Sequence, residues 1–291
     1  MTERVASATA VLVCQGRATA DGRYAVDRFS DPVARMLLDE AERLVVDLVR
    51  AGPVPAEAAT RMAFEMVRRV GLTMVPRTVA IDDAIRVHGA AQIVILGAGL
   101  DARAWRMTEL SRATVFEVDH LASQRDKARR VGDLVPTAER VVPVAVDLAI
   151  ERLGPALEGA GFAPQAVTTW VWEGVVPYLT RKQVRSTLAQ VAELSATGSR
   201  LVVNYQMASS VTRVMRAVMR LVLRVSRQSD PLAGEPWRSL WRPDRMRGLL
   251  GENGFAVTSD SDLLTLATGL SLPAENNGSL RNGRVAVAVR D

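Results

Sequence analysis

The feature that most constrains the fold is a short apolar segment, residues 92–96 (QIVIL), that runs directly into Gly97, Ala98 and Gly99. Apolar side chains on both faces of so short a strand suit the interior of a parallel sheet. The glycines allow a sharp turn and a close approach of the backbone to a ligand. Helix-compatible stretches separate this segment from four further apolar segments, at 114–118, 140–146, 166–172 and 200–205. The sequence therefore predicts a doubly wound, mostly parallel α/β sheet.

The first 75 residues have a different, helical pattern. Asp31 and Pro32 provide a helix N-cap followed by proline at the first helical position. Behind them apolar residues recur at helical spacing as far as Leu48, and glycine and proline then interrupt the pattern before a second helical stretch. We expect residues 1–75 to form an N-terminal helical cap, and residues 76–291 to form the core with the ligand site.

A helical insertion is predicted after the fifth strand, at residues 206–250. Within it, residues 211–228 combine apolar positions with an arginine every three or four residues, at Arg213, Arg216, Arg220, Arg224 and Arg227. On a helix this spacing aligns the guanidinium groups in one stripe. The stripe suits the solvated face of a packed helix, and also a lid over an acidic substrate, a partner or dimer surface, or an interfacial membrane helix.

Composition argues against several functional classes. A net charge of +5 spread along the chain and an aromatic content of 4% give no indication of nucleic-acid binding. With only His88, His120 and Cys14, the sequence predicts neither a metal site nor a disulfide framework. It contains no apolar run of the roughly 18 residues that a membrane span needs and no signal-peptide pattern. We expect a cytoplasmic protein that binds a small molecule, with a homodimer left open.

Carboxylates follow the ends of three predicted strands. Glu117 and Asp119 end the second strand, Asp147 and Leu148 follow the third, and Glu173 follows the fourth. Ligands of such sheets bind beyond the carboxyl ends of the strands. A carboxylate after the second strand suits ribose hydroxyls, and we place Asp119 ahead of Glu117 in that role. Asp147 and Leu148 suit the edge and face of an adenine.

The sequence GAGLDA also satisfies the dinucleotide fingerprint, with an acid about 20 residues later. Asp101 and Arg103 would, however, place charge where a pyrophosphate-binding helix must pack closely. Acids near consecutive strand ends suit a cationic, ribose-bearing ligand better than a pyrophosphate. An NAD-dependent dehydrogenase and a non-catalytic binding protein stay open as alternatives.

Four segments, QIVILGAGLDARAWR, VFEVDH, VAVDL and WVWEGVVPYLT, resemble the leucine carboxyl methyltransferase family. This family includes actinobacterial S-adenosylmethionine (SAM)-dependent methyltransferases and polyketide O-methyltransferases. The resemblance runs from about residue 16 to 255, and the stretches GRATADGRYAVDRFSDPVA and VPRTVAIDDAI also fit it. It implies a Rossmann-like class I methyltransferase fold with SAM as the cofactor.

The same resemblance implies roles for individual residues. Arg77 is expected to bind the methionine carboxylate, because a planar guanidinium matches a carboxylate bidentately. Arg17 is a second basic position near the cofactor. No catalytic residue is assigned, although Glu173, Tyr178 and His120 are candidates that line the pocket. The expected cofactor-binding residues are Arg77, Gly97, Ala98, Gly99, Asp101, Glu117, Asp119, Asp147, Leu148 and Glu173.

The expected activity is O-methylation in secondary metabolism, with the carboxylate of a small natural product as the acceptor. A carboxylate is ionised at neutral pH, whereas a phenol with a pKa of about 10 generally needs a base. The scarcity of histidine in this chain favours the carboxylate. A phenol, an alcohol, and a peptide or protein C-terminal carboxylate are the alternative acceptors.

Overall fold

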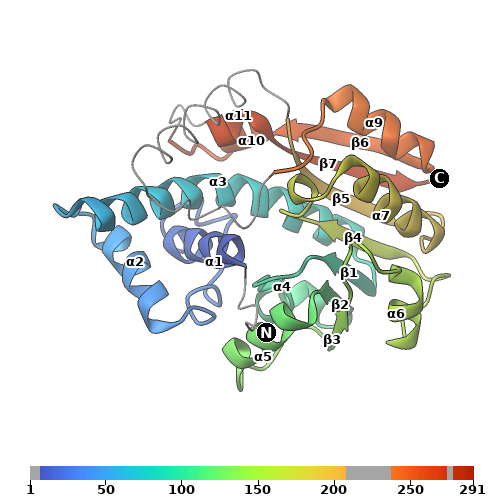
Figure 1. Ribbon diagram of the computed structural model, residues 1–291, viewed down its shortest axis with the longest axis horizontal. Coiled ribbons are helices and arrows are strands. Elements are labelled where there is room, and N and C mark those ends of the chain that lie inside the picture. The colour runs from blue at the N-terminus through green and yellow to red at the C-terminus, as the bar shows by residue number, and fades with distance from the viewer. Residues whose placement is uncertain (1–6, 208–236, 274–277) are drawn as a thin grey trace.

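The computed structural model describes residues 7–207, 237–273 and 278–291. A seven-stranded sheet forms its centre, with the strand order β3-β2-β1-β4-β5-β7-β6 (Figure 1). Strands β3 to β5 in this order are parallel, whereas the β5–β7 and β7–β6 pairs are antiparallel. This confirms the predicted mostly parallel sheet. The strands are Gln92–Leu96 (β1), Thr114–Asp119 (β2), Arg140–Ala145 (β3), Thr168–Trp172 (β4), Arg200–Gln206 (β5), Phe255–Asp262 (β6) and Gly283–Arg290 (β7).

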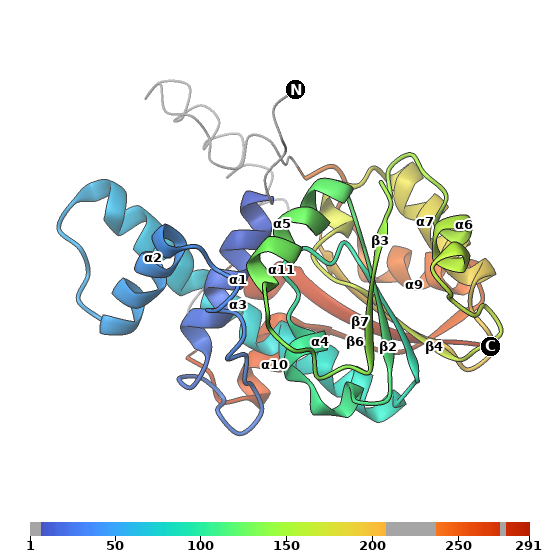
Figure 2. The same cartoon turned by 90° about the horizontal axis from the view of Figure 1, so that it is seen from below.

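Helices pack against both faces of the sheet, which explains why β1 is apolar at every position except its first. Val94 and Leu96 belong to one apolar core, together with side chains of α6 (Leu153–Gly159), α7 (Arg181–Glu193) and α9 (Pro243–Glu252). Ile93 and Ile95 belong to the other, with side chains of α3 (Ala58–His88), α4 (Arg103–Arg106) and α10 (Leu263–Gly269). Figure 2 shows α3 on one side of the sheet and α6 and α7 on the other. The other core helices in the described ranges are α5 (Leu121–Val131), α11 (Gly278–Asn282) and the short 3-10 helices η1 (Thr108–Leu110) and η2 (Val176–Tyr178).

The N-terminal helices α1 (Ala8–Ala20) and α2 (Glu40–Ala51) pack against α3, and α1 contacts it closely. Glycines allow that approach, since a Cβ at Gly16 would lie 2.6 Å from Val70 Cγ1 and one at Gly71 would lie 3.2 Å from the Gly16 carbonyl oxygen. The middle of α3, residues 71–79, is buried on all sides. Since Arg77 lies within this stretch, α3 carries a charged side chain into the interior.

The helix predicted to start at Asp31 is wrong in its first part. Residues 32–37 form turns, and the α-helix begins only at Glu40. Asp31 does cap locally, because its Oδ1 accepts the Ala34 N–H at 3.0 Å, but its Oδ2 receives the Arg17 guanidinium at 2.7 Å. The helical start signal is supplied instead by the capping box of Asp39 and Glu42. Asp31 therefore caps a turn instead of an α-helix, and its second oxygen binds Arg17.

The predicted boundary at residue 75 falls inside α3, which runs without interruption from the cap region into the core. The arginine-striped segment 211–228 lies outside the described residues. The described part of the predicted insertion at 206–250 includes most of α9. Among the described helices, none has the length and apolarity required to span a membrane.

Candidate cofactor site

The loop after β1 is tied to the end of β2. The Gly97 and Ala98 N–H groups both donate to the Val118 carbonyl oxygen, at 2.8 and 3.0 Å. Gly97 has a φ of +70°, and a Cβ there would lie closer than 3.0 Å to Val175 Cγ2. Both the left-handed conformation and the lack of space therefore require glycine at this position.

Asp119 lies at the carboxyl end of β2, where its carboxylate is held by two backbone donors. Oδ2 accepts the Gly99 N–H at 2.7 Å, and Oδ1 accepts the His120 N–H at 2.7 Å. The residue is half-buried and lies at the same edge of the sheet as the glycine loop. This arrangement can accept hydrogen bonds from ribose hydroxyls.

Glu117 has a different environment from Asp119. It is buried, and Lys127 Nζ lies 2.6 Å from its Oε1 while also donating to the Asp101 carbonyl oxygen at 2.7 Å. Burial raises the pKa of Glu117, and Lys127 opposes this shift. Glu117 thus supports the loop through Lys127, and the geometry favours Asp119 as the ribose ligand.

Asp147 and Leu148 follow β3, which pairs with β2 so that Asp119 lies opposite Ala145. Asp147 Oδ1 accepts the Ala149 N–H at 2.8 Å and lies 3.9 Å from His120 Nε2. Leu148 is half-buried and packs against the apolar core. The ends of β1, β2 and β3 therefore bring the glycine loop, Asp119, Asp147 and Leu148 to one edge of the sheet, as the strand-end argument expects.

Glu173, just after β4, joins two arginines. Its Oε1 lies 2.6 Å from Arg77 Nε, and its Oε2 accepts a hydrogen bond from Arg103 Nη1 at 2.7 Å. Burial alone would raise the pKa of this carboxyl, but Arg103, Arg77 and Arg17 outweigh it and lower the pKa of Glu173 to about 2. Glu173 is therefore a permanent anion between cations at neutral pH.

Among the arginines around Glu173, Arg77 is the one whose positive charge is least balanced by neighbouring acids. Burial lowers its pKa, Glu173 opposes that shift, and Arg17 and Arg103 add to it by repulsion. Its Nε–H is buried and lies only 2.6 Å from Glu173 Oε1, but the two groups are poorly aligned for a hydrogen bond. The contact between Arg77 and Glu173 is thus an attraction of charges without a well-directed hydrogen bond.

Sequence reasoning did not assign the residues that hold these groups in place. Arg103 donates from Nε to Asp82 Oδ1 at 2.7 Å and from Nη1 to the Asp101 carboxylate as well as to Glu173. Asp82 also receives Arg106 at 2.7 Å. Arg103 stands in a segment used for the resemblance, but a charged residue in a motif does not by itself reveal its partners.

Arg17 links the N-terminal helices to the same loop. Its Nε donates to Asp31 and its Nη2 donates to the Leu100 carbonyl oxygen at 2.6 Å. Burial alone would lower the pKa of Arg17. Asp31 and the other acids raise this pKa by more than burial lowers it, so the pKa of Arg17 lies above its usual value. The second basic position thus contacts the cofactor loop through the backbone.

The two other candidate residues, Tyr178 and His120, follow the carboxyl ends of β4 and β2. Tyr178 ends the short helix η2 and is half-buried. His120 is exposed and precedes α5. The roles of the candidate residues toward the cofactor stay predictions.

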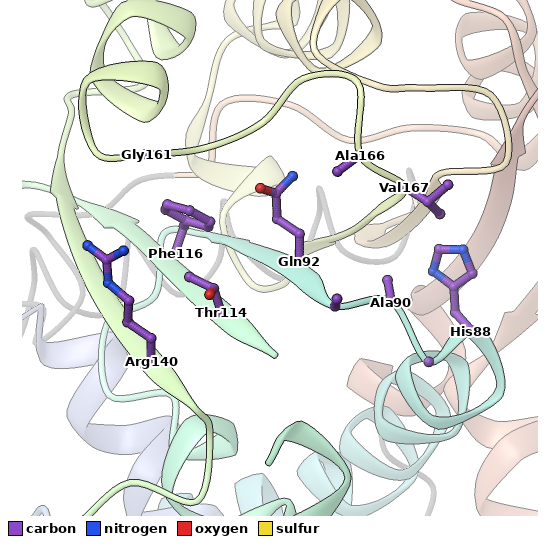
Figure 3. Close-up of a pocket in the computed structure, with 11 residues that line it drawn as sticks. His88, Ala90, Gln92, Thr114, Phe116, Arg140, Gly161, Ala166 and Val167 are labelled. Carbon is purple, nitrogen blue, oxygen red and sulfur yellow. The ribbon is translucent and has the colours of Figure 1, made fainter. Parts of the chain in front are cut away.

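A pocket of about 510 Å³ opens at the opposite edge of the sheet, at the amino ends of β1, β2 and β3 (Figure 3). Gln92, Phe116 and Arg140 line it, and its other lining residues include His88. His88 Nδ1 lies 2.6 Å from Thr169 Oγ1 and its Nε2 lies 3.0 Å from the Gly198 carbonyl oxygen, so the ring joins α3 to the sheet. None of the residues expected to bind the cofactor lines this pocket.

A mostly parallel seven-stranded sheet with a glycine loop and acids at successive strand ends defines a class I SAM-dependent methyltransferase fold. The model of the leucine carboxyl methyltransferase family matches residues 10–192, which is more than half of the chain. The chain belongs to this family, and the predicted resemblance is confirmed. Its cofactor is SAM, as the family and its relatives indicate.

Two relatives and one solved structure illustrate the similarity. A Mycolicibacterium smegmatis protein named "putative S-adenosyl-L-methionine-dependent methyltransferase" is 38% identical over 209 residues, 67% of this chain and 65% of the relative. A Frankia alni protein of the same description is 38% identical over 199 residues, with 67% and 66% covered. The chain thus spans slightly less than two thirds of these relatives. A duf574 family protein from Streptomyces avermitilis shares the fold, with a TM-score of 0.57, 13% identity and 98% of each chain covered.

The residues at this edge fit SAM chemically. The buried Arg77 guanidinium, whose one acidic contact among the described residues is Glu173, suits the methionine carboxylate, and the ionised Glu173 suits the ammonium group beside it. Asp119 offers lone pairs for ribose hydroxyls. In the described part of the chain, no group of three or more His, Cys, Asp or Glu side chains could hold a metal ion.

Proposed function

We propose that this protein transfers the methyl group of SAM to an oxygen nucleophile, and that this nucleophile is the carboxylate of a small natural-product acid. The observation that carries the proposal is the state of Glu173, the acid nearest to the expected amino acid end of the cofactor. Arg77 and Arg103 contact Glu173 and lower its pKa to about 2, so this carboxylate is a weak base at neutral pH. An acceptor that is already ionised needs no such base.

Five of the candidate residues have a direct binding role in this proposal. Arg77 binds the methionine carboxylate, Glu173 binds the ammonium group, and Asp119 binds the ribose hydroxyls. Asp147 contacts the adenine edge while Leu148 packs on its face. The bound cofactor supplies an electrophilic methyl group on a sulfonium, and the protein's part is to align the acceptor with it and to exclude water.

The glycine loop and its supports hold this geometry. Gly97, Ala98 and Gly99 are fixed by Val118 and Asp119, and Lys127 and Arg17 hold the following residues through backbone carbonyls. A site that is rigid before the cofactor binds loses little conformational entropy on binding. The buried, disulfide-free thiol of Cys14 is in keeping with a reducing cytoplasm, which we propose as the location of the protein.

The test is methyl transfer from SAM to matched carboxylic acids and phenols. For a carboxylate acceptor, the rate should be nearly flat with pH above the acceptor's own pKa, roughly 4 for a simple carboxyl group. The product should be an ester that mild base hydrolyses. A rate that rises through neutral pH, together with a product stable to mild base, would assign a phenol or alcohol instead.

A further inference from the structure

Glu173 is anchored unequally by its two arginine neighbours. Arg103 Nη1 makes a directed hydrogen bond to Glu173 Oε2 at 2.7 Å. Arg77 Nε comes within 2.6 Å of Oε1, but in the described part of the chain these two groups are poorly aligned for a hydrogen bond. The side chains of Arg77 and Glu173 are only 9% and 11% exposed, so water does little to screen their charges. The Arg77 contact is therefore the one that an incoming ligand can replace with better hydrogen bonds.

Arg103, by contrast, is held firmly where it lies. Its side chain is 3% exposed and contacts the carboxylates of Asp82, Asp101 and Glu173. Its backbone N–H also donates to Asp101 Oδ1 at 2.8 Å. If Arg77 left Glu173, Arg103 would stay and would continue to hold that carboxylate in position.

The charges around Arg77 and Arg103 also indicate that the Arg77 contact is the easier one to replace. Glu173 is the one carboxylate that Arg77 contacts among the described residues, whereas Arg103 contacts three. Burial and two neighbouring arginines lower the pKa of Arg77, while the surrounding acids raise that of Arg103 despite its burial. Arg77 is consequently the cation that gains most from a new anion.

We propose that Arg77 and Glu173 exchange their contact with each other for the two charges of the cofactor's α-amino acid group, and that Arg103 is the positioning residue that holds Glu173 during this exchange. The inference rests on the proposed roles of Arg77 and Glu173 toward the methionine moiety. A ligand that carries both a carboxylate and an ammonium group replaces the Arg77–Glu173 ion pair with two new ion pairs. Arg77 then binds the ligand carboxylate, and Glu173 binds the ligand ammonium. A ligand with one charge leaves either Arg77 or Glu173 buried with a partner missing, which is costly.

A series of four adenosine thioethers tests the exchange on the unaltered protein by calorimetry. S-Adenosylhomocysteine (SAH) carries both charges, its decarboxylated and deaminated analogues carry one each, and 5′-methylthioadenosine carries neither. Because 5′-methylthioadenosine leaves the Arg77–Glu173 pair closed, its affinity should equal or exceed that of either singly charged analogue. Removing each charge alone weakens binding by some factor. The factor for removing both charges together should be at least about tenfold smaller than the product of the two single factors.

Multiplicative losses would overturn the exchange, because they would show that each charge binds independently of the other. The series distinguishes this failure from failure of the proposed function. Binding of SAH without methylation of any carboxylic acid would count against the acceptor and would leave the ligand series valid. Absence of SAH binding would remove the basis of both.

The role of Arg103 is tested by Arg103→Lys, with Arg86→Lys as the control. Arg86 also pairs with two acids, Asp83 and Glu109, but its side chain is 35% exposed and lies outside the site. Arg103→Lys should weaken SAH about tenfold, because one ammonium cannot hold three carboxylates, and should change 5′-methylthioadenosine less than about twofold. Equal weakening of both ligands would reduce Arg103 to general structural support. If the variant does not fold, the ligand series on the unaltered protein still decides the exchange.

Discussion

Substituting Gly97 by alanine tests whether the cofactor loop depends on the close contact between the end of β1 and the segment after β4. The new Cβ would lie closer than 3.0 Å to Val175 Cγ2, a separation that real Cβ atoms essentially never show. Val175 is β-branched and has few alternative rotamers, so it cannot readily swing away. Either Val175 or the loop must therefore move.

Two costs contribute to the expected loss of stability. A non-glycine residue at a φ of +70° costs about 1 kcal/mol. Inserting a methyl group into packed surroundings lowers the stability by about a further 1–3 kcal/mol. We expect Gly97→Ala to lower the free energy of unfolding by about 2–4 kcal/mol and to weaken SAH binding, since the Gly97 and Ala98 N–H groups hold the loop on Val118.

Gly174→Ala is the matched control, because Gly174 has a nearly equal φ of +69° but no atom within 4 Å of the added Cβ. It should cost only the conformational share, about 1 kcal/mol. Urea unfolding of both variants, of Val175→Ala, and of Gly97→Ala combined with Val175→Ala separates the two terms. Equal losses for Gly97→Ala and Gly174→Ala, or no coupling between Gly97 and Val175, would refute the steric argument.

Three further predictions concern the charged residues of the site. Asp119→Ala should weaken SAH by about 1–3 kcal/mol in calorimetry, through lost ribose hydrogen bonds, and unchanged affinity in a folded variant would exclude Asp119 as the ribose ligand. Arg77→Lys should also bind SAH poorly, because an ammonium cannot replace a bidentate guanidinium, and affinity equal to that of the unaltered protein would remove Arg77 from the site. The pKa of Glu173 is lowered from 4.5 to about 2 in the folded protein, so its stabilising effect is complete above pH 4.5 and is lost as the pH falls toward 2. Acid unfolding followed by circular dichroism should accordingly show a shallower pH dependence in this range for Glu173→Gln, and identical slopes would contradict the ion pairing.

The sequence by itself determined the sheet and the edge at which the site lies. A short apolar segment such as residues 92–96 has one stable position, buried between two layers of helices, and both cores of the structure share it. Parallel strands end at the same edge, so acids that follow successive strands must come close together. Asp119 and Asp147 could therefore be placed at one site from their positions in the chain alone.

Only the tertiary structure decided which acids are available and which are already paired. Glu117 and Asp119 are two residues apart, yet Lys127 from α5 neutralises the first, while backbone donors hold the second. Arg103 donates a hydrogen bond to Glu173, which lies 70 residues further along the chain. Such pairings depend on how helices and strand ends meet in space, and a charged residue has many sterically acceptable partners along a chain.

The start of α2 shows the same division between local and tertiary information. Asp31 and Pro32 form a valid helix start signal, and Asp31 Oδ1 does accept the Ala34 N–H. The chain nevertheless continues in turns through residues 32–37, while Arg17 binds the other carboxylate oxygen. Local patterns predicted the elements because backbone hydrogen bonding and apolar periodicity act over a few residues. The ion pairs were decided by the fold, because a buried charge is stable only where a distant segment supplies its counter-charge.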